Sequence, residues 1–295
     1  MSRILIVKLG AAGDVVRTTP ILTALANYEI DWLTSSGNAP LLTGTSARVF
    51  KDPGEIEAGN TYELVISLEE DFPRLSRIFS GLRFQQVIGA YPASENRVLY
   101  TPEFDGWFDM SLISTYGPTE ANRLKIINRR SYQHIIFAGL GCQFAGEEYI
   151  LPSPATTSLR GDVALVDYAG GRWPNKRWGH LASLAARLSG LGTVNILPGR
   201  ESVLNHLGDI NNHRIIVTPD SLPMHLGIGL KKATFGIFNC TSPWEIHPYR
   251  TMTRLVSPRL SEFYYATEFI PDATLALPLD DVYNAVRQAL AKLGS

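Results

Sequence analysis

Residues 4–21, ILIVKLGAAGDVVRTTPI, constrain the possible fold more than any other stretch of this sequence. Residues 4–9 form an apolar run with one charge, which is typical of a strand buried in a parallel sheet. Gly10 and Gly13 then predict a tight turn, and Asp14 stands where a helix should begin. Asp14 is therefore expected at the carboxyl edge of the first strand, where open α/β sheets bind their ligands.

Alternating strand-like and helix-like segments predict an α/β chain with parallel sheets covered by helices on both faces. The strands expected after the first one are 29–34, 62–68, 86–90, 162–168, 193–197, 214–218 and 233–238. The expected helices are 37–43, 72–82, 118–128, 132–140, 178–189, 201–207, 223–230 and 279–293. Four strands of the second half open onto small or polar loops at 169–171, 198–199, 219–221 and 239–243. Such loops let a ligand approach the backbone N–H groups at helix N-termini, as at a nucleotide-binding edge.

A chain of 295 residues favours two domains. The texture changes over 145–161, which contains two prolines and many small polar residues. We therefore predict one domain over 1–150 and a second over 160–278. The last segment, 279–295, is expected to form a helix that can cross back to the first domain.

Composition limits the classes of function. A net charge of −1 gives no overall field that would attract nucleic acid, so no nucleic-acid partner is expected. Cys142 and Cys240 lie far apart and form neither a disulfide framework nor a zinc motif. We see no signal peptide and no apolar run of ~18 residues that would span a membrane, so we expect a cytoplasmic protein.

Four segments carry a family resemblance, and they read LGAAGDVVRTTP, NKRWGHLASLA, TPDSLPMHLG and FNCTSPWEIHPY. In this order and spacing they resemble the family 9 glycosyltransferases, the bacterial ADP-heptose:lipopolysaccharide heptosyltransferases. The resemblance covers most of the chain and is weak between 37 and 59. It implies the GT-B fold, in which two Rossmann-like domains face each other across a cleft. The first domain would bind the acceptor and the second the nucleotide-sugar.

The resemblance places the family's catalytic aspartate at Asp14. An inverting glycosyl transfer needs a base that removes the proton of the attacking acceptor hydroxyl, and a carboxylate serves this purpose. The alternative is an aspartate that only caps its helix. Gly13, Arg17 and Thr18 are expected to bind the acceptor.

On the donor side, the lysine of the K-x-W motif matches the family's phosphate-contacting residue at Lys176, and Arg177 is a neighbour that could substitute. The sequence contains no D-x-D motif, so cations and a helix N-terminus are expected to stabilise the leaving diphosphate, with no metal and no other cofactor. The alternative is a pair of surface cations before a helix.

The remaining donor contacts follow from two further motifs and one helix start. Where the family has D-T-G-x-x-H, this chain has D-S-L-P-M-H, so Leu222 replaces a glycine and leaves the donor's identity open. Glu201 could bind ribose hydroxyls or be an ordinary first-turn acid. The other candidates for donor binding are Asp220, Ser221, Met224, His225, Thr241 and Ser242.

The resemblance implies transfer of heptose from ADP-heptose to a lipopolysaccharide core or related glycan, with peripheral contact at the inner membrane. The first half also contains several arginines that would then meet acceptor anions, or would form a solvated face, at 74, 77, 83, 97, 129 and 130. The acids 69–71 are expected to be a solvated strand end and not a metal site. Three alternatives are a GT-B transferase with another donor or acceptor, a catalytically silent nucleotide-sugar binding module, and an oxidoreductase. The last is disfavoured because the first loop is G-x-x-G and lacks G-x-G-x-x-G.

Overall fold

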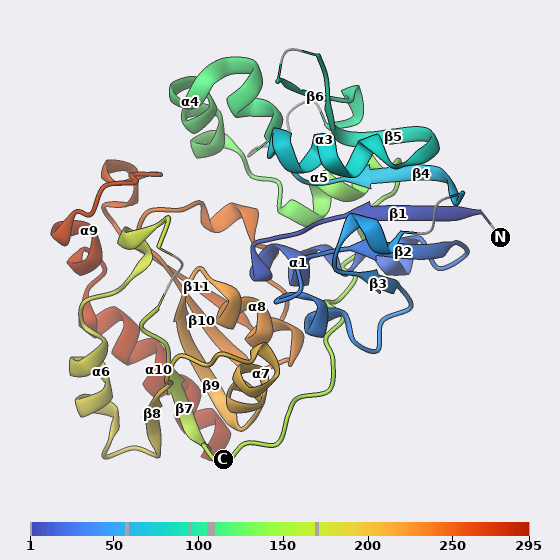
Figure 1. Ribbon diagram of the computed structural model, residues 1–295. Helices are drawn as coiled ribbons and strands as arrows, with labels where there is room; N and C mark the ends of the chain where they lie inside the picture. Colours follow the sequence, from blue (N-terminus) through green and yellow to red (C-terminus); the bar gives the residue numbers. More distant parts are fainter. Residues whose placement is uncertain (1, 57–58, 95, 105–109, 169–170, 295) are drawn as a thin grey trace. The chain divides into compact units, whose positions relative to one another are not determined.

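A computed structural model of the chain divides into two compact units, Met1–Pro152 and Ser153–Ser295 (Figure 1). It describes residues 2–56, 59–94, 96–104, 110–168 and 171–294. Residues 169–170, part of one of the four predicted loops, lie outside the described residues. The two units are considered separately below.

The first unit is built on a sheet with the strand order β3-β2-β1-β4-β5-β6. All neighbouring strands are parallel except β6, which pairs antiparallel with β5. The strands are β1 (Arg3–Val7), β2 (Glu29–Leu33), β3 (Arg48–Phe50), β4 (Thr61–Ser67), β5 (Arg83–Pro92) and β6 (Val98–Tyr100).

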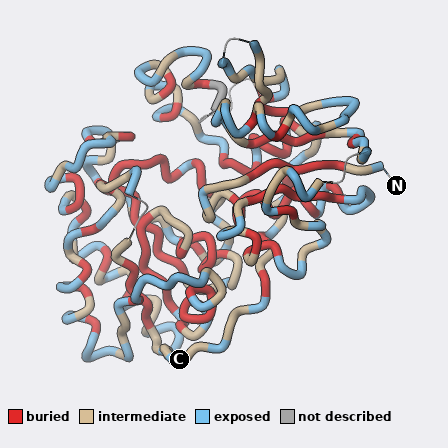
Figure 2. The backbone as a smooth tube through the Cα atoms, in the orientation of Figure 1, coloured by how far each residue is buried: buried red, intermediate tan, exposed pale blue. Residues whose placement is uncertain are grey.

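Strand β1, in the middle of its sheet, is buried in the core of the first unit. Ile4, Leu5, Ile6 and Val7 are each at most 2% exposed, so both faces of this strand are covered, as its apolar run predicts (Figure 2). Leu5 and Val7 share one core cluster with residues of β2, β3, β4 and α3.

The helices predicted over 72–82 and 132–140 are present, whereas the segment 37–43 forms only a 3₁₀ turn. The helices of the first unit are α1 (Ala12–Thr18), α2 (Ile21–Ala24), α3 (Phe72–Ser80), α4 (Met110–Ile127) and α5 (Tyr132–Gly139), with 3₁₀ turns η1 (Ala39–Leu42), η2 (Pro53–Glu55) and η3 (Pro102–Phe104). The helix predicted from residue 118 is only the second part of α4, which is kinked at Gly117 with φ 75°. Pro118 suggests a helix start because proline fits a first turn, and here it begins the second part after the kink.

The second unit has an entirely parallel sheet with the order β11-β10-β9-β7-β8. Its strands are β7 (Gly161–Leu165), β8 (Val194–Ile196), β9 (His213–Pro219), β10 (Ala233–Phe238) and β11 (Met252–Val256). Its helices are α6 (Leu181–Leu188), α7 (Val203–Asn211), α8 (Leu222–Gly229), α9 (Pro271–Leu275) and α10 (Leu279–Gly294), with 3₁₀ turns η4 (Pro174–Lys176), η5 (Pro243–Glu245) and η6 (Leu260–Glu262).

Helix α8 packs very closely on this sheet. A Cβ atom on Gly227 of α8 would lie 2.6 Å from Oγ1 of Thr234, and one on Gly236 of β10 would lie 2.9 Å from Sδ of Met224. Two glycines, one on each partner, therefore bring the helix and the sheet together. This contact fixes the height of the α8 N-terminus relative to the end of β9.

The last helix, α10, packs within the second unit. Val282 and Val286 of α10 are fully buried in one cluster with Leu184 and Leu188 of α6. The apolar face of α10 is therefore used by the core of the second unit.

Each sheet has one point at which the order of its strands reverses. In the first unit this switch point lies between β1 and β4, and in the second it lies between β7 and β9. Ligands of open α/β sheets bind at the carboxyl ends of the strands at such a point. The loop after β1 carries Asp14, and the loop after β9 carries Asp220.

We predict that Gly89→Ala will lower the free energy of unfolding by about 3 kcal/mol. Gly89 has φ 103°, and an added Cβ would lie 2.0 Å from the carbonyl oxygen of Ser67 in the neighbouring strand. Such a contact requires the backbone to move and adds to the cost of positive φ. Gly141→Ala is the matched control, because Gly141 has φ 68° and nothing lies within 4 Å of the added atom. We expect Gly141→Ala to lower the free energy of unfolding by about 1 kcal/mol. Equal losses for the two variants in urea denaturation would contradict the steric argument.

Candidate functional site

Asp14 lies in the first turn of α1, at the switch point of the first sheet. Its Oδ2 accepts the backbone N–H of Ala11 at 3.3 Å, so Asp14 is the third residue of the helix and bonds back to the N-cap residue Ala11. Its Oδ1 pairs with Nη2 of Arg17 at 2.9 Å, and Oδ2 lies 4.0 Å from Nζ of Lys8. A third of the side chain, 33%, stays exposed. The two cations stabilise the charged carboxylate and hold it in one orientation.

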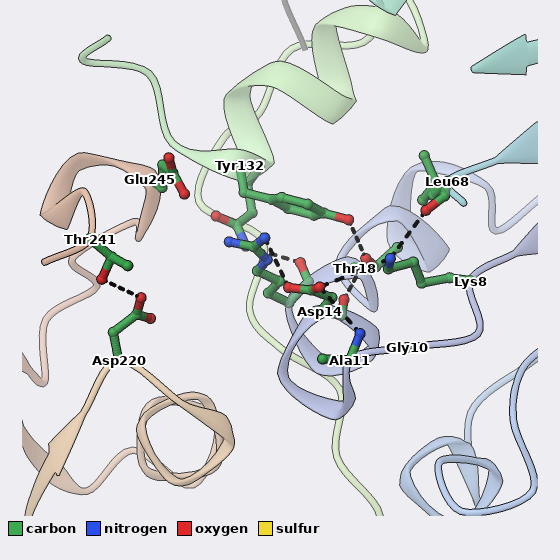
Figure 3. Close-up of polar contacts among 12 residues, drawn as sticks. Lys8, Gly10, Ala11, Asp14, Thr18, Leu68, Tyr132, Asp220, Thr241 and Glu245 are labelled. Carbon is green, nitrogen blue, oxygen red and sulfur yellow. Dashed lines mark hydrogen bonds and ion pairs between the residues drawn. The ribbon is translucent and has the colours of Figure 1, made fainter. Parts of the chain in front are cut away.

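Arg17 and Thr18 contact Asp14 from the buried side of α1. Figure 3 shows Thr18 bonded to both Asp14 and Tyr132. Thr18 Oγ1 donates to the carbonyl oxygen of Asp14 at 2.6 Å and lies 2.6 Å from the hydroxyl of Tyr132. Since the single hydroxyl proton of Thr18 goes to that carbonyl, Tyr132 is the donor in the second bond. The guanidinium of Arg17 stacks 4.0 Å from the centre of the Tyr132 ring.

The residues predicted to bind the acceptor differ in their exposure. Thr18 is 0% exposed and contacts the backbone carbonyl of Asp14, whereas Arg17 is 8% exposed and contacts the carboxylate. Gly13 is partly exposed within α1. Lys8 and Tyr132 were not among the predicted site residues.

Glu69 is a correction to the predicted solvated strand end. Its side chain is only 11% exposed, and Oε1 accepts the N–H groups of Leu9 at 2.6 Å and Gly10 at 3.2 Å. The same oxygen lies 3.3 Å from Nζ of Lys8. Its neighbours behave differently, since Glu70 is exposed and Asp71 caps α3.

Lys176, Asp220 and Thr241 meet at the switch point of the second sheet. Thr241 Oγ1 donates to Asp220 Oδ2 at 2.8 Å (Figure 3). Lys176 Nζ pairs with the same oxygen at 2.8 Å. These residues come from η4 and from the ends of β9 and β10. Burial alone would raise the pKa of Asp220, but the Lys176 ammonium and the Thr241 hydroxyl outweigh it and lower the pKa to about 2. Asp220 is therefore a permanent anion at neutral pH.

A buried asparagine holds the segment that carries Lys176. Asn175 is 0% exposed, and its side chain donates to the carbonyl oxygens of Ala266 and Glu268 and accepts the N–H of Ile270 at 2.8 Å. All of its amide hydrogens and one acceptor position are thus used. The ammonium of Lys176 is consequently presented from a fixed backbone.

The α8 N-terminus differs from the prediction in one respect. The N–H of Asp220 donates to the carbonyl oxygen of Ile237 at 3.3 Å, so it belongs to the sheet and is not directed at a phosphate. Ser221 is the N-cap residue, and its hydroxyl bonds weakly to the carbonyl oxygens of Tyr168 and Pro219 at 3.4 and 3.3 Å. Leu222 begins the helix without a positive φ.

Two other predicted donor contacts on α8 are buried. Met224 is 0% exposed and packs under Gly236, so its side chain belongs to the core. His225 is 4% exposed and close enough to Asp220 to help lower the pKa of that carboxyl. The prediction that Met224 binds the donor is therefore not carried into the proposed site.

Ser242, Glu201 and Arg177, which were also predicted to bind the donor, differ in burial and in their partners. Ser242 is 1% exposed, and its Oγ accepts the N–H of Trp244 at 3.3 Å. Glu201 is exposed and precedes α7, which begins only at Val203 after the cap Ser202. Arg177 pairs with Asp167 at 2.9 Å, so its charge is already matched by an exposed acid.

Some of the arginines of the first half have local partners. Arg77 pairs with Asp52 at 3.0 Å, and Arg129 and Arg130 bond to nearby backbone carbonyl oxygens. Within the described ranges, no group of three or more histidine, cysteine or acidic side chains is arranged to hold a metal ion. None of the helices in the described part of the chain is both long and apolar enough to cross a bilayer.

We predict that Lys176→Met will lower stability by about 3 kcal/mol at pH 7, because it leaves the Asp220 carboxylate buried without its cation. In the wild type the pKa of Asp220 lies below its ordinary value of 3.8, so the group stabilises the fold at neutral pH and this is lost between about pH 4 and 2. In the variant burial dominates and raises the pKa above 3.8, so a proton taken up on acidification relieves the penalty. The loss should thus be smaller at pH 5 than at pH 7 in chemical denaturation, and the exposed Lys51→Met should show neither effect.

Comparison with known proteins supports the fold and not a closer relationship. No protein-family model matches the sequence, and no curated protein matches it. Among solved structures, E. coli heptosyltransferase WaaC with ADP-2-deoxy-2-fluoro heptose is similar at a TM-score of 0.58 and 14% identity, covering 97% of this chain and 99% of that chain.

Two further structures are similar over nearly their whole lengths. E. coli ADP-heptose lps heptosyltransferase II has a TM-score of 0.64 at 14% identity, with all of both chains covered. A family 9 glycosyl transferase from Veillonella parvula has a TM-score of 0.64 at 13% identity, covering 99% of this chain and 97% of that chain. The chain therefore has the α/β GT-B fold of these heptosyltransferases, as its motifs predict.

Proposed function

We propose that this protein is an inverting, metal-independent glycosyltransferase that moves heptose from ADP-heptose to a lipopolysaccharide core or related surface glycan. The observation that carries the proposal is the setting of Asp14. A partly exposed carboxylate stands at the switch point of its sheet and is fixed by Arg17 at 2.9 Å and by the N–H of Ala11 at 3.3 Å. A catalytic base needs both a fixed orientation and access to its substrate.

In this proposal Asp14 accepts the proton of the acceptor hydroxyl. The hydroxyl oxygen forms a bond to the anomeric carbon of heptose while the bond from that carbon to the diphosphate oxygen breaks. The proton goes to Asp14, and ADP leaves with the electron pair. A single displacement of this kind inverts the anomeric configuration.

The second unit supplies the groups that stabilise the leaving diphosphate. Lys176 uses one of its three ammonium protons on Asp220, which leaves two donors for phosphate oxygens. The α8 N-terminus at Ser221 adds the partial positive charge of a helix end. Asp220 fixes the ammonium through the 2.8 Å bond and is proposed to orient the donor sugar.

Leu222 favours a donor other than ADP-heptose. The family motif has glycine there, and a leucine at the start of α8 takes up space next to the proposed phosphate position. A GT-B transferase with another nucleotide-sugar is therefore the second candidate function. The two similar heptosyltransferases named for ADP-heptose or its analogue support the first.

The proposal also covers the acceptor and the cellular location. We propose a glycolipid acceptor and peripheral contact with the cytoplasmic face of the inner membrane, on the basis of the family resemblance. A catalytically silent nucleotide-sugar binding module would share the second unit but would not need Asp14.

We predict that Asp14→Asn will lower kcat at least ~100-fold, because an amide cannot accept the hydroxyl proton. The assay uses ADP-heptose with heptose-free lipopolysaccharide. The binding of ADP should stay within twofold of the wild type, since the proposed donor groups belong to the second unit. Asp71→Asn is the control, because Asp71 also accepts a backbone N–H in the first turn of a helix. Full activity of Asp14→Asn would reject the proposed mechanism and favour the silent module.

We predict that ADP-heptose will raise the melting temperature equally in buffer with magnesium and in buffer with excess EDTA. The expectation follows from charge neutralisation by Lys176 and the α8 N-terminus in place of a metal ion. GDP- and UDP-sugars tested in parallel should give no comparable shift. A larger shift with GDP-mannose or UDP-glucose would select the alternative donor, and loss of the ADP-heptose shift in EDTA would contradict metal independence.

A further inference from the structure

Glu69 joins the two strands that flank the switch point of the first sheet. It follows β4, and it bonds to the three residues that continue β1, namely Lys8, Leu9 and Gly10. One oxygen, Oε1, receives all three bonds, at 3.3, 2.6 and 3.2 Å. Charge-assisted bonds from two consecutive backbone N–H groups are strong because the acceptor carries a full charge.

The loop that leads to Asp14 is thereby held by two carboxylates. Glu69 binds the N–H groups of Leu9 and Gly10, and Asp14 itself binds the N–H of Ala11. Lys8 adds a bond from Nζ to the carbonyl oxygen of Leu68 at 3.1 Å (Figure 3). Glu69 therefore fixes the path of the backbone from β1 into α1 relative to β4.

Glu69 also shares a cation with Asp14. Nζ of Lys8 lies 3.3 Å from Glu69 and 4.0 Å from Asp14. Burial lowers the pKa of Lys8, but the carboxylates of Asp14 and Glu69 outweigh it and raise the pKa, so the ammonium stays charged.

Among the described residues, charged or titratable side chains from several elements lie around Asp14. They include Lys8 at the end of β1, Arg17 of α1, Glu69 after β4 and Tyr132 of α5. Burial raises the pKa of Tyr132, so this phenol stays neutral at working pH. Lys8 and Arg17 add positive charge near Asp14, and Glu69 adds negative charge.

We propose that Glu69 is a positioning residue for the transfer reaction, which fixes the β1–α1 loop and maintains the strength of Asp14 as a base by sharing Lys8. This inference rests on the proposed role of Asp14. Without the charge of Glu69, the ammonium of Lys8 acts on Asp14 alone and stabilises its carboxylate. A more stable carboxylate is a weaker base.

Glu69→Gln separates the charge from the geometry. The amide keeps an oxygen that can accept from Leu9, Gly10 and Lys8, and it has the same size. We expect kcat to fall about two- to threefold with the KM for ADP-heptose within twofold, and the acid limb of the pH profile to move down by roughly half a pH unit. Glu70→Gln is the matched control, because it removes the same charge from an exposed neighbouring side chain, and its profile should match the wild type.

Glu69→Ala tests the loop. It removes the acceptor of two backbone N–H groups, so the amides of Leu9 and Gly10 should exchange with solvent at least about tenfold faster. We expect kcat to fall about 100-fold, more than in Glu69→Gln, because misplacement of a catalytic group is costly. Glu70→Ala should leave the exchange of these amides unchanged.

The outcomes separate this inference from the proposed function. If Asp14→Asn is inactive while Glu69→Gln keeps the wild-type kcat and pH profile, Glu69 does not tune the base and the inference is overturned. If Asp14→Asn keeps full activity, the proposed function fails, and with it the part of the inference that concerns the base. Unchanged amide exchange in Glu69→Ala would overturn the positioning of the loop whatever the activity.

Discussion

A lysine bonded to a carboxylate across the switch point is the interaction on which both units depend. In the first unit Lys8 at the end of β1 lies 3.3 Å from Glu69 after β4, and in the second Lys176 in η4 after β7 lies 2.8 Å from Asp220 after β9. Removing two charges from water costs several kcal/mol, so such pairs stabilise a fold only weakly. Their effect here is geometric, because each one ties the segment that follows one strand to the segment that follows the neighbouring strand.

The same constraint explains which parts of the fold the sequence could predict. β1, β4, β9 and β10 were expected within two residues at each end because they are apolar runs that end at polar, glycine or proline residues. The strands β3, β6 and β11 were missed. β3 has three residues, and Phe50 alone among them is buried, so its pairing with β2 depends on the neighbouring strand and not on a local pattern.

The candidate site could be predicted in part for a similar reason. Asp14, Lys176 and Asp220 stand beside turn residues at strand ends, which is a local signal. Lys8, Glu69 and Tyr132 act through partners 61 and 114 residues away in the sequence, which no local pattern records. One signal was present, because a lysine within a buried apolar run needs a carboxylate partner, and the acids after the adjacent strand were the available ones.

The spacing of Asp14, Arg17 and Thr18 along α1 also contains a signal that the prediction of the site did not use. Arg17 and Thr18 stand three and four residues after Asp14, so all three lie on one helix face. Neighbours on one face contact one another before they contact a substrate, and Arg17 and Thr18 are 8% and 0% exposed. Arg17 holds the carboxylate of Asp14 and Thr18 holds its backbone carbonyl, both from the buried side, while a third of the Asp14 side chain stays exposed. A base needs both features, because its position must be fixed by the protein while part of the carboxylate stays accessible to a hydroxyl.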